Sequence, residues 1–123
     1  TMQGIDLFKF QAAADCGTAP STITNWVNSE VIAKAGQCAY YRLEATNTFS
    51  NKSVTNIALT DTLVDKLTYQ SDFSSKTSNN SPVATSNISG QIIRGTFGTL
   101  VGKEVGTIYF SAKISQAGAT ATP

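Results

Sequence analysis

Histidine is absent from this sequence of 123 residues. Without it the chain cannot form a Ser-His-Asp triad, a Cys-His pair or the HExxH zinc helix of a metalloprotease. The only two cysteines do not form a CxxC motif, so a zinc site of the usual kind and a thioredoxin-like redox pair are not expected. No glycine-rich phosphate loop follows a strand and opens a helix. We therefore expect no enzyme activity, no cofactor and no stoichiometric metal.

Charge and long apolar runs are scarce as well. Nine Lys and Arg residues stand against eight Asp and Glu residues, a net charge of +1, and no run of like charge occurs, so a nucleic-acid partner is not expected. No stretch approaches the roughly 18 apolar residues of a transmembrane helix. The opening Thr-Met-Gln-Gly is not a signal peptide, so we expect any targeting or anchoring sequence to lie outside this segment.

What is present suits one small all-β domain spanning residues 1–123. Hydrophobic residues make up 41% of the chain, enough for a real but small core. Helix signals are almost missing, and short apolar runs rich in Val, Ile, Thr and aromatic residues alternate with Gly, Asn and Ser clusters. We predict strands over residues 5–11, 37–47, 54–60, 67–69, 91–97 and 107–114. Two facing antiparallel sheets, an immunoglobulin-like β-sandwich, would bury their apolar sides.

The alternation within the strands predicts which side chains face the core. Strand 37–47 places Tyr41 and Leu43 on one side and Tyr40 on the other. The residues predicted to be buried are Tyr41, Leu43, Ile57, Leu59, Ile108 and Phe110. Those predicted to be exposed are Arg42, Glu44 and Lys113, with Tyr40 and Tyr109 also pointing outward. We expect the first strand to pair within the chain beside the strand that ends at Ile114.

Two segments between the strands differ in character. Residues 70–90 contain twelve Ser, Thr or Asn among 21 positions, which is typical of a mobile surface loop. Residues 12–35 instead carry Cys16, Trp26 and several aliphatic side chains within polar text. Those apolar residues need a surface to lie on, and Trp26 is interpreted as an anchor that seats this segment on the core.

The two cysteines lie at either end of that second segment. With no metal site available, a structural disulfide between Cys16 and Cys38 is one interpretation, and it would stabilise the fold by about 3 kcal/mol and indicate an oxidising compartment. Two unrelated buried thiols are the alternative, because free cysteine often behaves as a small core residue.

The order of the motifs resembles a known family. "AKAGQCAYYRLEATNTFSNKSVTNIALTDTL", "LTYQS" and "FGTLVGKEVGTIYFSAKI" together resemble the bacterial surface repeat called the domain of unknown function 11 family, over about residues 31–114. Paired cysteines with an aspartate before the first look like a Gram-negative subgroup. Val64 departs from the pattern, which often has proline there. The resemblance implies an immunoglobulin-like sandwich in exported or surface-anchored proteins, often one of a series of such domains, and it implies no activity.

Two hypotheses about chemical function remain, one based on a pair of carboxylates and one based on a lysine. Asp61 and Asp65 flank a predicted turn, but they lack the ligand spacing of a calcium loop, and we interpret Asp61 as a cap of that turn. A lysine to asparagine cross-link is the second hypothesis, because a buried lysine is neutral and nucleophilic. Its candidates are Lys9, with Asn47 or Asn56 as acceptor and Glu44 or Asp61 as the proton shuttle. A solvated Lys9 on an ordinary strand face is the simpler alternative.

Recognition is the remaining class of function. Trp26, Tyr40 and Tyr109 are the candidate ligand contacts, because exposed aromatic residues on a rigid sandwich bind at little cost in entropy. A passive spacer would spread such residues, whereas an adhesin would gather them. We expect a non-catalytic structural or assembly module of an extracellular, cell-surface or periplasmic bacterial protein, monomeric in isolation. An adhesin-type module that binds a carbohydrate or protein is one alternative. The other is a fibre subunit that assembles by strand addition through its first strand or its tail "ISQAGATATP".

Overall fold

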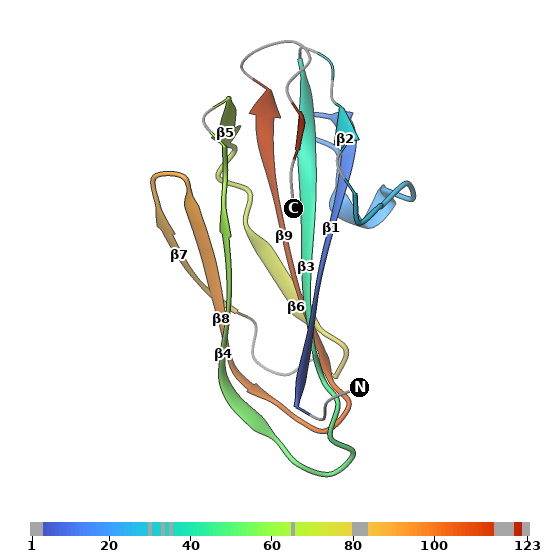
Figure 1. The fold of residues 1–123 in the computed structure, drawn as a ribbon, viewed down its shortest axis with the longest axis vertical. Coiled ribbons are helices and arrows are strands. Elements are labelled where there is room, and N and C mark those ends of the chain that lie inside the picture. Colours follow the sequence, from blue (N-terminus) through green and yellow to red (C-terminus); the bar gives the residue numbers. More distant parts are fainter. Residues whose placement is uncertain are drawn as a thin grey trace.

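The computed structural model describes residues 4–29, 31–32, 34, 36–64, 66–79, 84–114 and 120–121. Two antiparallel sheets pack face to face and form an immunoglobulin-like β-sandwich, with the strands running along the long axis of the molecule (Figure 1). This confirms the predicted fold class. The half-apolar strands could bury one face only by facing a second sheet, and that is the arrangement observed.

Five strands make the larger sheet and three make the smaller one. The larger sheet has the order β1-β3-β9-β5, with β6 also paired to β9, and the smaller has the order β4-β8-β7. Their bounds are β1 (Ile5–Asp15), β3 (Gln37–Asn47), β4 (Val54–Thr62), β5 (Leu67–Tyr69), β6 (Ser74–Thr77), β7 (Thr85–Ser89), β8 (Ile92–Leu100) and β9 (Val105–Ile114). Two short strands, β2 (Val31–Ile32) and β10 (Thr120–Ala121), pair with each other, and one 3-10 turn, η1, covers Pro20–Thr22.

The core lies between the two sheets, and the predicted register is confirmed. Tyr41 and Phe110 are buried neighbours on β3 and β9, with stacked rings whose centroids lie 5.0 Å apart. The facing β4 contributes Ile57 and Leu59, which are buried too. A slip of one residue would have turned each strand inside out, so the alternation located the core correctly. The core members predicted and found buried are Tyr41, Leu43, Ile57, Leu59, Ile108 and Phe110.

The position of β1 differs from the prediction. It pairs along its whole length with β3, from Ile5 opposite Asn47 to Asp15 opposite Gln37, and β9 lies on the other side of β3. The expectation that β1 lies beside the strand ending at Ile114 is therefore wrong, although β1 does pair within its own chain. The disulfide between Cys16, which directly follows β1, and Cys38 in β3 joins the two strands at one end of the pair.

The described parts of the segment 70–90, residues 70–79 and 84–90, contain more regular structure than their composition predicts. They contain β6, which pairs with β9, and β7, which pairs with β8. Asp72 fastens the start of this segment, because its carboxylate accepts bonds from the backbone N–H and the hydroxyl of Ser111 at 2.9 and 2.5 Å. The prediction of a loop was wrong because the polar side chains face solvent while the backbone completes the sheets.

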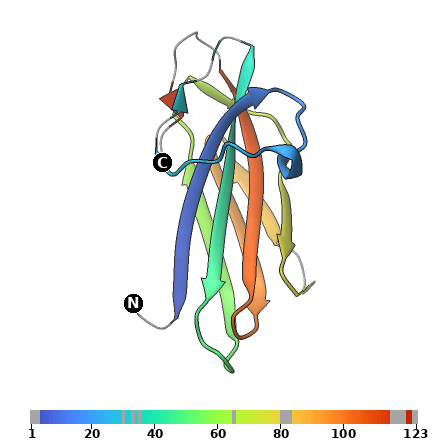
Figure 2. The same cartoon turned by 90° about the vertical axis from the view of Figure 1, so that its right-hand side faces the viewer.

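The outer face of the larger sheet is partly covered. The segment after Cys16 crosses this face in front of β9 and β3 and returns toward β1 (Figure 2). Val27 exchanges two backbone hydrogen bonds with Gln11, at 2.8 and 3.0 Å, which holds the crossing segment against β1. A second, smaller cluster of buried residues forms beneath it, made of Ala12, Ile23, Cys38 and Tyr40.

Candidate functional site

The disulfide is present between Cys16 and Cys38, whose Cα atoms lie 4.9 Å apart. Cys38 lies in β3 opposite Ala14, and Cys16 directly follows the end of β1, so the bond joins two neighbouring strands at one end of the sheet. Of the two interpretations of the cysteines, the structural disulfide is confirmed. It indicates an oxidising, non-cytoplasmic compartment.

Aromatic rings and cations form a continuous row across the outer face of the larger sheet. Phe10 on β1, Arg42 on β3 and Tyr109 on β9 are opposite one another in the strand register. Trp26, from the crossing segment, lies over the middle of this row. Its ring centroid is 6.1 Å from that of Tyr109, and the Arg42 guanidinium carbon is 5.0 Å from the Trp26 ring and 4.2 Å from the Phe10 ring. We call this set, with Phe8 stacked 6.4 Å from Phe10, the aromatic row.

The aromatic row explains why two predicted surface residues are only half exposed. Arg42 lies between two rings, and its Nε is 3.0 Å from a carboxylate oxygen of Glu44 on the same strand. The prediction that Arg42 and Glu44 are exposed was wrong, because ring stacking and ion pairing cover both. Lys113 is exposed as predicted.

Tyr40 is not a ligand contact. It points away from the core, as the alternation predicts, but the crossing segment covers it and leaves 1% of its surface exposed. Its hydroxyl donates a hydrogen bond of 3.1 Å to the carbonyl of Asp15. Tyr40 therefore forms the surface on which the apolar residues of the crossing segment lie. Trp26 packs against the same cluster, so the anchoring role predicted for it is confirmed.

A shallow groove opens at one end of the aromatic row. It has a volume of about 210 Å³ and lies between η1, β6 and β9. The half-exposed ring of Tyr109 lies in its wall, with the Lys76 ammonium 5.8 Å from the ring centroid. Its lining residues are Pro20, Ser21, Ser74, Ser75, Lys76 and Tyr109. Trp26 and Tyr109 were both predicted as ligand contacts, and the structure places their rings side by side, with Tyr109 in the groove wall and Trp26 outside the groove lining.

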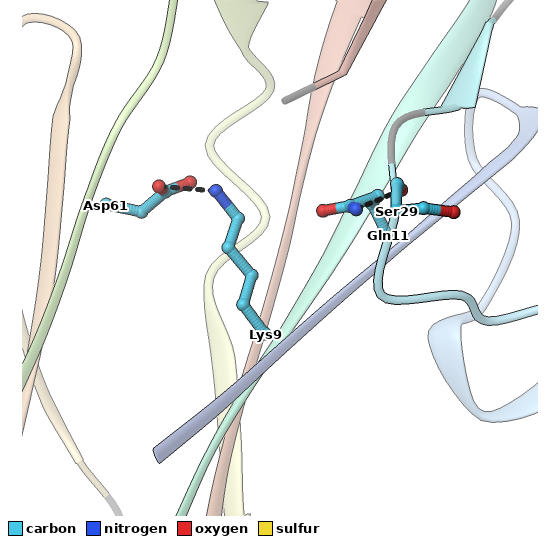
Figure 3. A network of polar contacts seen from close by, with 4 residues as sticks. All are labelled: Lys9, Gln11, Ser29 and Asp61. Carbon is cyan, nitrogen blue, oxygen red and sulfur yellow. Dashed lines mark hydrogen bonds and ion pairs between the residues drawn. The ribbon is translucent and has the colours of Figure 1, made fainter. Parts of the chain in front are cut away.

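Lys9 reaches from β1 across to the other sheet. Its Nζ lies 2.6 Å from Oδ1 of Asp61 on β4, and both side chains are largely buried (Figure 3). The same ammonium is 5.0 Å from the centroid of the Tyr41 ring. Further along β1, Gln11 donates from its amide to the carbonyl of Ser29 in the crossing segment. Neither the solvated position predicted for Lys9 nor the turn cap predicted for Asp61 is observed, because the two side chains form an ion pair between the sheets. Asp65, the other carboxylate named at that turn, lies outside the described residues.

The asparagines named for a cross-link are engaged elsewhere. The Asn47 amide donates to the carbonyls of Lys52 and Leu100 at 2.7 and 3.0 Å, and its oxygen accepts from the backbone of Phe49. Asn56 is exposed on β4 in a left-handed conformation, with φ of 56°. Glu44 lies on the opposite face of the sheet, paired with Arg42. The geometry gives the asparagine cross-link no support and instead brings Asp61 to Lys9.

The ion pair between sheets has one electrostatic neighbour of note. Burial raises the pKa of the Tyr41 phenol well above its usual value, and the nearby negative charge of Asp61 raises it further. Tyr69, whose hydroxyl accepts a bond of 3.1 Å from the backbone N–H of Phe73, also has a raised pKa, mainly through burial. Both phenols therefore stay protonated to higher pH than free tyrosine does.

The described residues lack two further features. No cluster of three or more side chains suited to holding a metal ion occurs there. None of the helical segments described is long and apolar enough to cross a membrane. Comparison of the chain with protein-family models, curated proteins and solved structures gives no match. The resemblance of residues 31–114 to the domain of unknown function 11 family therefore stays a prediction.

The sequence reasoning missed three members of the site. Phe10, Arg42 and Lys76 were not among the ligand contacts predicted from the sequence. The signal that identifies them is the strand pairing, because Phe10 and Tyr109 face the same side only once β1 and β9 are placed on either side of β3. Lys76 requires the further knowledge that a polar segment forms β6.

Proposed function

We propose that this domain is a non-catalytic structural module of an exported bacterial protein, and that it transmits tension between neighbouring domains at the cell surface or in the periplasm. The observation that supports this role is the direction of the first and last long strands. β1 begins beside Asn47, at one end of β3, and β9 finishes beside Cys38, at the other end. A pull on Ile5 and Ile114 therefore runs parallel to the strands.

This geometry loads many hydrogen bonds together. Because β1 and β9 both pair with β3 and are drawn in opposite directions, each ladder is sheared along its length. The backbone of Gly4 adds a further attachment, since its carbonyl accepts a bond of 2.8 Å from the N–H of Thr48. Ladders that must break as a unit resist a force better than ladders that open one bond at a time.

The disulfide opposes the same motion. Cys16 follows the far end of β1 and is bonded to Cys38 in β3, so β1 cannot slide free of β3 while the bond is intact. Tension passes from β1 into β3 through the sulfur atoms and bypasses the crossing segment. The oxidising compartment that the disulfide indicates is consistent with an extracellular or periplasmic location.

Force spectroscopy on single molecules tests the proposal. With handles attached to the two ends of the oxidised chain, we expect one high-force rupture. Handles placed beside Gly4 and Ser50, at the same end of the sandwich, would peel β1 from β3 and should give a much lower force. After reduction, the unfolded chain should be longer by the 22 residues that the disulfide closes, roughly 75 Å at ~3.5 Å per residue. Equal forces along the two directions would reject a load-bearing role.

Recognition is the second candidate, and the aromatic row favours it. Aromatic residues that a passive spacer would spread are gathered here on one face, beside a groove that also contains the exposed Lys76. A recognition role does not conflict with load bearing, because the aromatic row lies on the outer face and the disulfide lies at one end.

Assembly into a fibre has less support. No described residue pairs with the outer edge of β1 between Ile5 and Lys9, and Leu7 is 62% exposed there, so an edge is available. However, Lys9 turns inward from this edge to Asp61, and an inward charge on an edge strand is a device that discourages pairing with another chain. The part of the tail that is described, β10, pairs with β2 of its own chain.

A further inference from the structure

We propose that the groove between η1, β6 and β9 binds an acidic saccharide, with the sugar ring against Tyr109 and its carboxylate at Lys76. This inference deepens the recognition role and does not depend on the load-bearing one. The groove offers three kinds of contact within about 210 Å³: an aromatic face, several hydroxyl groups and one ammonium. It is smaller than the pockets that take drug-sized molecules, so it suits one or two sugar rings.

The aromatic contact is held in place from behind. Tyr109 is half exposed, and Trp26 lies 6.1 Å away on the side of the aromatic row. Arg42 lies over the Trp26 ring in turn and Phe10 lies beyond Arg42, so the Tyr109 ring rests against a row of packed neighbours. A ring fixed in this way presents a flat apolar surface at little cost in entropy. The C–H face of a pyranose ring is the chemical partner of such a surface.

The hydroxyl groups lie around that surface. Ser21 in η1 and Ser74 in β6 are exposed in the groove lining, and each hydroxyl both donates and accepts. Ser75 lies opposite the buried Ile108 and its hydroxyl accepts a bond of 3.0 Å from the backbone N–H of Ala84, so its side chain is on the other face of β6 and the groove hydroxyls are those of Ser21 and Ser74. Sugar hydroxyls have the same dual capacity, so alternating donors and acceptors are satisfied by such a ligand.

The positive charge of Lys76 favours an acidic sugar over a neutral one. Lys76 is exposed, and among the described residues it forms no ion pair. Glu44 on the same face is paired with Arg42, and the Asp72 carboxylate is turned to the N–H and hydroxyl of Ser111. The groove therefore offers one exposed ammonium, that of Lys76, beside an aromatic ring. A carboxylate on the ligand would gain a charge-assisted hydrogen bond from Lys76, which a neutral sugar cannot make.

The chain contains its own reporter for this binding. Trp26 is the only tryptophan, and its ring lies next to that of Tyr109, so a ligand in the groove should change its fluorescence. We would titrate the oxidised protein with a galacturonic acid trisaccharide and, in a parallel arm, with the uncharged galactose trisaccharide. We expect a saturable change with the acidic sugar, with Kd on the order of 1 mM for so shallow a site. The neutral sugar should bind about tenfold more weakly.

Two substitutions at exposed positions locate the site. Lys76→Gln should weaken acidic binding about tenfold and remove its dependence on salt, and Ser21→Leu should weaken both sugars by filling the groove. Lys113→Gln is the matched control, because Lys113 is an exposed lysine on β9 four residues beyond Tyr109 and outside the groove lining. It should bind as the unmodified protein does.

Three results with the unmodified protein and Lys76→Gln would each overturn the proposal. The first is no saturable change with the acidic sugar, the second is equal affinity for the two sugars, and the third is unchanged affinity in Lys76→Gln. Binding that survives Ser21→Leu would place the ligand elsewhere and would also reject this groove. Peptides carrying phosphate are a separate class of ligand, and tighter binding of phosphoserine than of galacturonate would count against a saccharide. The rupture forces described above do not depend on any of these outcomes.

Discussion

Lys9 and Asp61 join the edge strands of the two sheets through a contact of 2.6 Å, across 52 residues of sequence. Only 18% of the Lys9 side chain and 11% of the Asp61 side chain are exposed, so the pair is largely removed from water. An ion pair in such a place costs free energy to desolvate, and its members depend on one another.

The first prediction concerns this pair. Asp61→Asn should destabilise the fold by about 3 kcal/mol, because it removes the carboxylate that compensates a largely buried ammonium. Replacing both residues by leucine should cost much less, since apolar residues Leu43 and Leu59 line the same region. Denaturant unfolding of Lys9→Leu, Asp61→Leu and the double variant measures the coupling. Additive losses would mean that the two charges do not stabilise each other.

The second prediction concerns the disulfide. Replacing Cys16 and Cys38 by serine should lower the free energy of unfolding by about 3 kcal/mol, because a closure of 22 residues restricts the unfolded chain. Unfolding curves recorded with and without a reductant supply the measurement. The serine variant is its own control and should not respond to the reductant. Two titratable thiols in the unfolded, unreduced protein would contradict the bond.

The third prediction concerns two glycines, one in β9 of the larger sheet and one in β8 of the smaller sheet. A methyl group on Gly106 of β9 would lie 2.7 Å from a ring carbon of Phe97, which is fully buried and has no room to move. Gly106→Ala should therefore cost about 1–3 kcal/mol through overpacking. Gly98→Ala in β8 is the control, because nothing lies within 4 Å of that position. Thermal unfolding should separate the two variants, and equal midpoints would show that Phe97 yields to the new methyl group.

The fourth prediction concerns alkaline pH. Burial and the charge of Asp61 raise the pKa of Tyr41 above the value of about 10 that it has in the unfolded chain. Above that pH the unfolded state releases a proton that the folded state retains, so the stability present below pH ~10 is lost as the pH rises. Tyr41→Phe should flatten this part of the stability curve. Ultraviolet titration should show Tyr41 ionising later than a free phenol, and ionisation near pH 10 without unfolding would contradict the burial.

The core was predictable because alternation reports which face of a strand a residue occupies. Tyr41 and Leu43 fall on the buried face by that rule, and β9 follows it equally well. Alternation does not report what covers the other face. Tyr40 was predicted outward and does point outward, yet a segment that crosses from β1 covers it. No local pattern in β3 contains that information.

Strands made mainly of polar residues were the second feature that the sequence pattern did not predict. In β6 and β7 most side chains are polar and exposed, and only Thr77 is buried and Ile88 packs against the core, so the backbone ladders with β9 and β8 are what identify the two segments as strands. The ion pair of Lys9 with Asp61 was not predicted for a related reason, although both residues were named as candidates for a cross-link. A lysine on the inner face of an edge strand breaks the expected pattern, and its partner Asp61 lies in a different sheet. The groove at Tyr109 was not predicted because its two sides are formed by β6, a polar strand, and by the crossing segment, and the sequence pattern located neither of them there.

The course of the segment from Gly17 to Ser29 has a consequence for proteolysis. It runs outside both sheets, most of its residues are exposed, and it lies within the loop that the disulfide between Cys16 and Cys38 closes. A protease that cuts once within it produces two fragments that remain one covalent molecule, with β1 still paired to β3. Such a nick changes the mass of the oxidised protein only by one added water. The two fragments separate under denaturing conditions only after a reductant breaks the disulfide.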